Sequence, residues 1–219
     1  MLKIYGVYKS RATRILWLME ELGAPFELVP VLQAYKLKDP VADGVRLNTR
    51  SPEFLAINPM GSIPTIVDDG LVLNESLAQT VYVARKHGGP LAPKDAAEDA
   101  LMLQWTLFGA TSIETEALKI AMANNEGRLG TEAGQAEAKA VARILARPFG
   151  VLEKHFAAND YAVGGRFTVA DINLAEIVRY AQAYQPLFDA HPKTAAWLGR
   201  VQARPGFKAM WEKRLAEVE

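Results

Sequence analysis

The first 85 residues alternate between strand-like and helix-like spacing of apolar positions. Residues 2–5 (LKIY) and 26–31 (FELVPV) are short apolar runs of the kind that forms strands. Between them, apolar residues recur at positions 15, 18, 19 and 22, which predicts an amphipathic helix that opens at Ser10 and ends at Gly23. Because two parallel strands need a crossover connection, this segment predicts a β-α-β unit.

A polar, irregular stretch at 33–52 separates this unit from a second one. TIVDDGLVL (65–73) predicts a β-hairpin with Asp69-Gly70 as its turn. The apolar residues of 76–87 again have helical spacing. The second unit is therefore β-β-α.

The pattern changes at GGPLAPKD (88–95), where two glycines and two prolines indicate a linker. Beyond it the spacing is helical, over 96–125 and 131–157. Gly109 could bend the first of these helices, and Pro148 is expected to kink or split the second.

Further helices are predicted near the C-terminus. Thr168 and Asp171 form a capping-box pattern, and the helix that they open is apolar nearly all round, which predicts burial. Another helix follows Pro192 and should stop near Pro205-Gly206. The expected fold is an α/β domain at 1–87, the linker at 88–95 and an all-α domain at 96–219.

Composition narrows the class of protein. The 219 residues include 25 basic and 25 acidic side chains, so no charge excess indicates nucleic acid. No long apolar run indicates a membrane span, and the first residues enter a strand pattern without a signal sequence, which predicts a cytoplasmic protein. There is no cysteine, and the three histidines are far apart in sequence, so we expect no disulfide and no metal site.

Three motifs carry a family resemblance. They are N-P-x-G-x-I-P at 58–64, E-S at 75–76 and F-T-V-A-D at 167–171, and SRATRILWLMEELG at 10–23 supports them. In this order and at this spacing, over nearly the whole chain, they resemble the soluble glutathione S-transferases. Among these, the chain looks like a bacterial member nearest to the serine-type classes, which are plant- and theta-like. The resemblance implies a thioredoxin-like first domain, glutathione as co-substrate, no metal and a homodimer.

The resemblance assigns the glutathione-binding residues. Ile63-Pro64 would be a cis peptide, which leaves the backbone of Ile63 to pair with the cysteinyl part of glutathione. Alternatively, Pro64 only starts an edge strand. Ser76, at a helix start, would bind the γ-glutamyl carboxylate and Glu75 its ammonium, although Ser76 could also form a plain capping box with Gln79.

The glycine carboxylate of glutathione needs a basic partner. Arg50, in R-S-P-E-F-L, resembles the basic position of plant-type members that contacts this carboxylate, and a guanidinium can bind it with two hydrogen bonds. Arg50 could equally be a solvated loop residue. Three nearby residues could serve instead: Lys36, Lys38 and Arg46.

A thioredoxin-like domain without cysteine has to take its thiol from glutathione. The resemblance makes Ser10 the hydroxyl that donates a hydrogen bond to the sulfur and favours the thiolate. Ser10 could instead be a helix N-cap only. Tyr5, at the end of the first strand, is the runner-up, followed by Tyr8, Thr13, Arg11 or backbone groups.

The electrophile would bind between the domains, with Tyr8, Trp105 and Phe108 as candidate wall residues, although helically spaced aromatics are more often core. The sequence does not choose among halogenated aromatics, epoxides, enals and peroxides. The leading function is conjugation of glutathione to a small hydrophobic electrophile. The alternatives are a non-catalytic binding or regulatory protein of the same fold, and a glutathione-dependent isomerase.

Overall fold

The computed structural model describes residues 1–218, and its contacts divide the chain into two compact units. One unit contains residues 1–86 together with the C-terminal segment from Pro205 onward, and the other contains residues 87–204. The sequence interpretation placed 96–219 in one helical domain, so the assignment of the last segment differs. This segment is far from residues 1–86 in sequence, so its packing on the N-terminal unit could not be predicted from the order of the elements.

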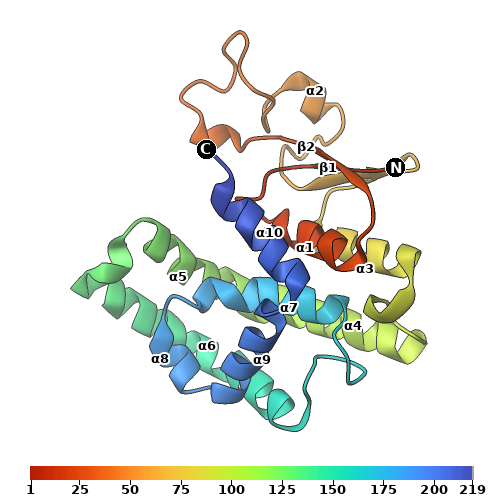
Figure 1. The fold of residues 1–219 in the computed structure, drawn as a ribbon. Coiled ribbons are helices and arrows are strands. Elements are labelled where there is room, and N and C mark those ends of the chain that lie inside the picture. Colours follow the sequence, from red (N-terminus) through yellow and green to blue (C-terminus); the bar gives the residue numbers. More distant parts are fainter. Residues whose placement is uncertain (219) are drawn as a thin grey trace. The chain divides into compact units, whose positions relative to one another are not determined.

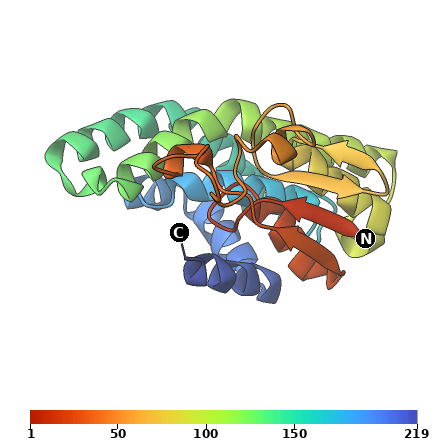
Figure 2. The ribbon, with the colours of Figure 1, turned by 90° about the horizontal axis from the view of Figure 1, so that it is seen from above.

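The N-terminal unit is built on a four-stranded sheet in the order β2-β1-β3-β4 (Figures 1 and 2). The strands are β1 (Leu2–Tyr5), β2 (Phe26–Val29), β3 (Thr65–Asp68) and β4 (Leu71–Leu73). β2 is parallel to β1, β3 is antiparallel to β1, and β4 is antiparallel to β3. The turn between β3 and β4 has positive φ at Asp69 (49°) and Gly70 (84°), as a tight hairpin requires. The predicted β-α-β and β-β-α units are confirmed.

Helix α1 (Thr13–Leu22) follows β1 and ends at Gly23, whose φ of 59° is the left-handed conformation of a C-cap. It begins three residues later than predicted, because residues 8–12 form turns. Its residues Ile15 to Leu18 are fully buried. The other helices of the N-terminal part of the unit are α2 (Pro52–Leu55) and α3 (Ser76–His87), with a short 3-10 helix at Ala34–Lys36.

Helix α10 (Pro205–Ala216), which the apolar pattern did not predict, lies beside α1 (Figure 1). The rings of Trp17 and Phe207 meet edge to face, with centroids 4.9 Å apart. Gly206 allows a close approach, since a Cβ atom there would lie 2.7 Å from the carboxylate carbon of Glu21. The C-terminal segment is thereby fixed against the first helix of the chain.

The unit of residues 87–204 is helical, and its predicted stretch at 96–125 has three parts. Helix α4 (Ala96–Gly109) passes into a π-helical segment (Ala110–Glu114) and then into α5 (Thr115–Asn125). Gly109 lies where α4 packs on α7 (Val169–Val178), and a Cβ atom there would come within 2.9 Å of the side chain of Ile177. The expected irregularity at Gly109 is thus a π segment, a rare feature that often lies at functional sites.

Helix α6 (Glu132–Ala158) is continuous, so the expectation that Pro148 splits it is wrong. α6 lies beside α5 in both ribbon views (Figures 1 and 2). Proline removes the hydrogen bond to the carbonyl four residues earlier, which here belongs to Ile144. Ile144 is 58% exposed, so water can satisfy that carbonyl, while the ring of Pro148 is buried.

Helix α7 is buried over its whole length and starts with the predicted capping box. The Thr168 amide donates to Asp171 Oδ2 at 2.9 Å, and Asp171 also accepts from the Ala162 amide and from Trp197 Nε1. Burial raises the pKa of Asp171 to about 6. The remaining helical elements are α8 (Gln185–Asp189), α9 (Pro192–Gln202) and the 3-10 helices Gly89–Leu91, Arg128–Gly130 and Arg179–Ala181.

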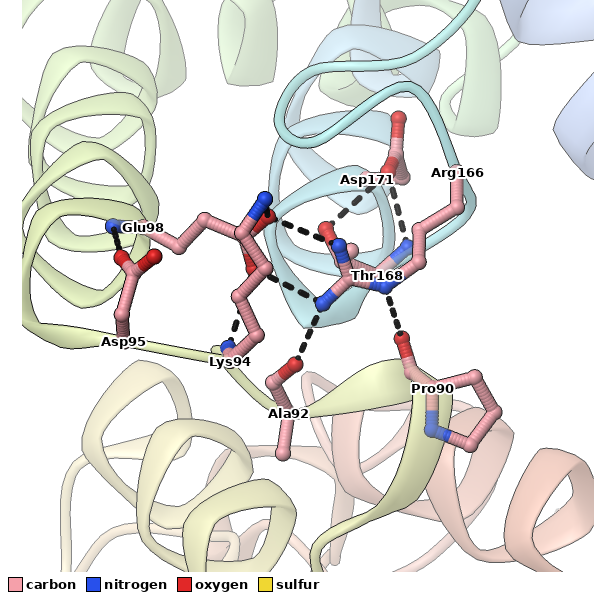
Figure 3. A network of polar contacts seen from close by, with 8 residues as sticks. All are labelled: Pro90, Ala92, Lys94, Asp95, Glu98, Arg166, Thr168 and Asp171. Atoms are coloured by element: carbon pink, nitrogen blue, oxygen red, sulfur yellow. Dashed lines mark hydrogen bonds and ion pairs between the residues drawn. The ribbon is translucent and has the colours of Figure 1, made fainter.

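A polar network joins the segment before α4 to the loop before α7 (Figure 3). The guanidinium of Arg166 donates to both carboxylate oxygens of Glu98, each at 2.8 Å, and to the carbonyls of Pro90 and Ala92. The Glu98 amide in turn donates to Asp95, which caps α4. The predicted linker is therefore held to the helical unit by hydrogen bonds. Within residues 1–218, no helix is long and apolar enough to cross a membrane.

Candidate functional site

Ser10 lies in the turns between β1 and α1, two residues before the N-cap position of the helix. Its hydroxyl donates to the Val7 carbonyl at 2.6 Å and accepts from the Ala12 amide at 3.0 Å. The helix begins at Thr13 with Ala12 in the cap position, so Ser10 is not the side-chain N-cap of α1. The hydroxyl is half-buried, and the hydrogen bonds of its own turn orient it. It is the hydrogen-bond donor that could act on a thiol sulfur.

The peptide between Ile63 and Pro64 is cis, as predicted. It lies against the turn that carries Ser10, because a Cβ atom on Gly6 would be 3.7 Å from Pro64 and 3.1 Å from the Ala12 side chain. The ladder between β1 and β3 ends at the pair Tyr5–Thr65. Ile63 therefore lies beyond the paired part of the sheet, where its backbone can meet a ligand strand.

The other motif residues hold this loop in place. Asn58 is fully buried, and its side-chain amide donates to the Ser62 carbonyl at 2.8 Å and to Thr65 Oγ1 at 2.9 Å. Gly61 has a φ of 57°, and a Cβ atom there would lie 2.9 Å from the Thr49 carbonyl. The asparagine and the glycine of N-P-x-G-x-I-P thus fix the conformation of the loop. The loop in turn holds the cis-proline in place.

Gln79 ties α3 to the same loop. Its Nε2 donates to the carbonyls of Pro64 at 2.8 Å and Leu73 at 2.9 Å. Ser76 is already the first residue of α3, and the Gln79 amide donates to the Glu75 carbonyl. The alternative in which Ser76 and Gln79 form a capping box is wrong, because Gln79 Oε1, which would accept from the cap amide, is buried without a hydrogen-bond partner among the described residues, while Nε2 donates to Pro64.

Ser76 and Glu75 lie at the start of α3 in different environments. Ser76 is buried, and its Oγ accepts a hydrogen bond from Arg14 Nη1 at 2.9 Å, whereas Glu75 is exposed. Since Oγ accepts from Arg14, the hydroxyl proton of Ser76 remains to be donated to a ligand. Contacts through Gly6, Pro64 and Gln79 thus join the Ser10 turn, the cis-proline and the start of α3.

A cavity of about 400 Å³ in this unit has a mainly basic lining, which also includes Glu217. Its cations are Lys9, Lys36, Lys38 and Arg46, and its apolar lining includes Val7, Leu32 and Leu37. Arg50 is exposed and is not among the residues that line the cavity. Of the basic residues considered from sequence, the structure thus brings the three alternatives to a cavity, but not Arg50.

The two tyrosines considered for thiol activation lie in different places. The Tyr5 ring packs beside Phe54, with centroids 6.3 Å apart. Tyr8 is buried, its hydroxyl is hydrogen-bonded to Lys213 of α10, and burial raises its pKa. The side chain of Tyr8 therefore faces α10, and among the described residues it is Val7 and Lys9 of this turn that line the cavity.

The aromatic candidates on α4 are packed together. Trp105 is 8% exposed, and its ring meets that of Phe108 edge to face, with centroids 5.6 Å apart. The ring of His155 lies tilted against Trp105, with centroids 4.5 Å apart. Phe108 is half-buried. Trp105 is thus mainly a core residue of its unit, while Phe108 keeps an accessible surface. Among residues 1–218 there is no group of three or more His, Cys, Asp or Glu side chains that could hold a metal ion.

The comparisons with known proteins agree with this arrangement. Residues 10–86 match the family model described as the glutathione S-transferase N-terminal domain, and residues 99–205 match that of the C-terminal domain. Glutathione S-transferase 3 of Zea mays is 32% identical over 215 residues, which cover 94% of this chain and 91% of the relative. The chain belongs to the glutathione S-transferase family.

Solved structures share the fold over nearly the whole chain. Glutathione transferase F7 from Populus trichocarpa has a TM-score of 0.81 at 26% identity and covers 98% of this chain and 99% of its own. A glutathione transferase family member from Pseudomonas fluorescens, crystallised with two glutathione bound, has a TM-score of 0.77 at 26% identity, with coverages of 96% and 92%. The predicted fold class, a thioredoxin-like domain followed by helices, is confirmed.

Proposed function

We propose that the chain is a glutathione S-transferase that conjugates the glutathione thiolate to a small hydrophobic electrophile. One observation carries this proposal: a single run of contacts joins the Ser10 turn, the cis-proline and the start of α3. The hydroxyl can donate to a thiol, and the unpaired strand edge can bind a peptide backbone. The helix start with its adjacent carboxylate can bind the two charges of an amino-acid zwitterion.

Glutathione would bind through three parts of the site. The backbone of Ile63 would pair with the cysteinyl unit in the manner of an added strand. The Ser76 hydroxyl and the free amides of the first turn of α3 would bind the γ-glutamyl carboxylate, and Glu75 its ammonium. Arg50 remains our candidate for the glycine carboxylate, with the cations of the cavity, Lys36, Lys38 and Arg46, as the alternative.

The chemistry follows from the surroundings of Ser10. The hydroxyl would turn from the Val7 carbonyl to the glutathione sulfur and would keep the hydrogen bond from the Ala12 amide. A donor to sulfur stabilises the thiolate relative to the thiol, so the thiol loses its proton near neutral pH. The thiolate then attacks an electrophilic carbon. A carbon–sulfur bond forms, and either a leaving group departs or the adduct takes up a proton. Tyr5 stays the runner-up.

Three further parts of the function are proposals of the same kind. Phe108 and Trp105, with Tyr8 as a less favoured candidate, would contact the electrophile. A homodimer would cover apolar side chains that are open in the single chain, among them Leu55 (37% exposed) and Met60 (60% exposed). Met60→Asp should then shift the mass measured by light scattering to that of a monomer.

The cytoplasm is the proposed compartment, since glutathione keeps thiols reduced there.

The experiment is conjugation by the purified full-length chain with a panel of halogenated aromatics, epoxides, enals and peroxides. Glutathione adducts should form with at least one class and should be identified by mass. Glutathione binding without turnover on any compound would favour the non-catalytic alternative. An isomerised product without glutathione consumption would favour the isomerase alternative.

A further inference from the structure

The end of the chain holds the turn that carries Ser10. Both carboxylate oxygens of Glu217 accept backbone hydrogen bonds from this turn, Oε1 from the Tyr8 amide at 2.8 Å and Oε2 from the Lys9 amide at 2.7 Å. The Tyr8 contact joins positions 209 residues apart. Hydrogen bonds to an ionised carboxylate are shorter and about twice as strong as those between neutral groups.

The residues before Glu217 strengthen this attachment. Arg214 donates to the Tyr8 carbonyl, and Lys213 contacts the Tyr8 hydroxyl. The peptide between Tyr8 and Lys9 is therefore held at both ends, by Glu217 at its amide and by Arg214 at its carbonyl. α10 itself is fixed on α1 through Trp17 and Phe207, so this attachment rests on a rigid element.

The peptide between Val7 and Tyr8, which leads to Ser10, also has a hydrogen bond at each end. A peptide unit is planar, so its amide and carbonyl turn together. At one end of this unit the Tyr8 amide donates to Glu217, and at the other end the Val7 carbonyl accepts the hydroxyl proton of Ser10. Glu217 and the Ser10 hydroxyl are thus connected through one rigid group.

We propose that Glu217 is a positioning residue for thiol activation, because it fixes the backbone of the turn at Tyr8 and Lys9 and thereby the place of Ser10, whose hydroxyl can then turn from the Val7 carbonyl to the sulfur. The inference rests on the proposed function, in which Ser10 donates to the glutathione sulfur. Glu217 acts through the turn and does not need to touch the sulfur. Without it, the Tyr8 and Lys9 amides lose their acceptor and the turn is held less tightly, so Ser10 no longer keeps one position relative to the sulfur.

The test compares Glu217→Ala with Glu212→Ala, a matched control that removes an exposed carboxylate from α10 itself. Glu217→Ala should lower kcat about tenfold, with little change in KM for glutathione, since mispositioning a group by about an ångström costs one to two orders of magnitude. Glu217→Gln keeps one acceptor oxygen and should fall between wild type and Glu217→Ala. Added formate should restore part of the activity of Glu217→Ala alone, because it can accept from the freed amides.

A second readout does not depend on activity. Hydrogen exchange should show the Tyr8 and Lys9 amides protected in wild type and Glu212→Ala and unprotected in Glu217→Ala. If wild type conjugates glutathione and Glu217→Ala matches Glu212→Ala in kcat, the positioning role is overturned and the proposed function stands. If wild type forms no adduct, the proposed function fails and the positioning role fails with it. A folded Glu217→Gln keeps the comparison valid should the alanine variant not fold.

Discussion

The guanidinium of Arg14 on α1 donates a hydrogen bond to the hydroxyl of Ser76 at the start of α3, at 2.9 Å. Arg14 is 2% exposed and Ser76 is 5% exposed, so this contact lies inside the N-terminal unit. A buried charge is retained only where it is hydrogen-bonded. Arg14 therefore sets the orientation of the hydroxyl that we assign to the γ-glutamyl carboxylate, and it places a positive charge beneath that anion.

Arg14→Met is expected to weaken glutathione binding about tenfold, since a hydrogen bond that involves a charged group is worth about 1.5 kcal/mol or more. Isothermal titration with glutathione measures the change. In a Ser76→Ala background the same substitution should have a clearly smaller effect, because the hydrogen bond is already absent and only the attraction between the Arg14 charge and the carboxylate is lost. An equal loss of affinity in both backgrounds would show that Arg14 acts independently of Ser76.

Glu75→Gln is expected to reduce glutathione affinity by about threefold to fivefold, because exposed ion pairs contribute at most about 1 kcal/mol. The control is a ligand rather than a variant: glutaryl-cysteinyl-glycine, which lacks the α-amino group. Its affinity should be the same for wild type and Glu75→Gln. If the substitution weakens both ligands equally, Glu75 does not contact the ammonium.

Local signals in the sequence predicted the elements that local interactions form. The spacing of apolar residues in α1, the left-handed glycine at 23 and the Asp69-Gly70 turn each have a short-range cause, and so does the capping box of Thr168. α2 was missed although Ser51-Pro52 has the composition of a helix start, because four residues are too few for a periodic pattern.

The supports of the candidate site could not be predicted, because they join distant positions. Arg14 falls within an apolar helix and gives no sign that it is buried against Ser76. Glu217 reaches the Ser10 turn from the other end of the chain. No periodicity encodes such contacts, since they depend on how helices and sheet pack. The site residues found from sequence came from motifs, and the residues that orient them came from the structure.

The ion pair of Glu98 and Arg166 predicts a pH dependence of stability. Hydrogen bonds from Arg166 hold the pKa of Glu98 at about 2, below its usual 4.5. Because the folded pKa is lower than the unfolded one, the pair stabilises the fold above about pH 4.5 and loses this contribution as the pH falls toward 2. The loss should reach about 2–3 kcal/mol in the free energy of unfolding.

Urea unfolding of wild type and Glu98→Gln at several pH values between 6 and 2.5 measures this contribution. Glu98→Gln should be less stable at pH 6 and should lose less stability on acidification, whereas Glu212→Gln, an exposed control, should follow wild type. If wild type and Glu98→Gln lose stability in parallel over this range, the carboxylate of Glu98 does not stabilise the fold through its charge.

The central claim is that the Ser10 hydroxyl stabilises the thiolate of bound glutathione. The ultraviolet absorbance of the thiolate, followed against pH in wild type and in Ser10→Ala, tests it most directly. We predict a pKa of the bound thiol well below the free value of about 8.5 in wild type, and a value close to that of the free thiol in Ser10→Ala. A lowered pKa that the substitution leaves unchanged, or the absence of bound thiolate at any pH, would contradict the account.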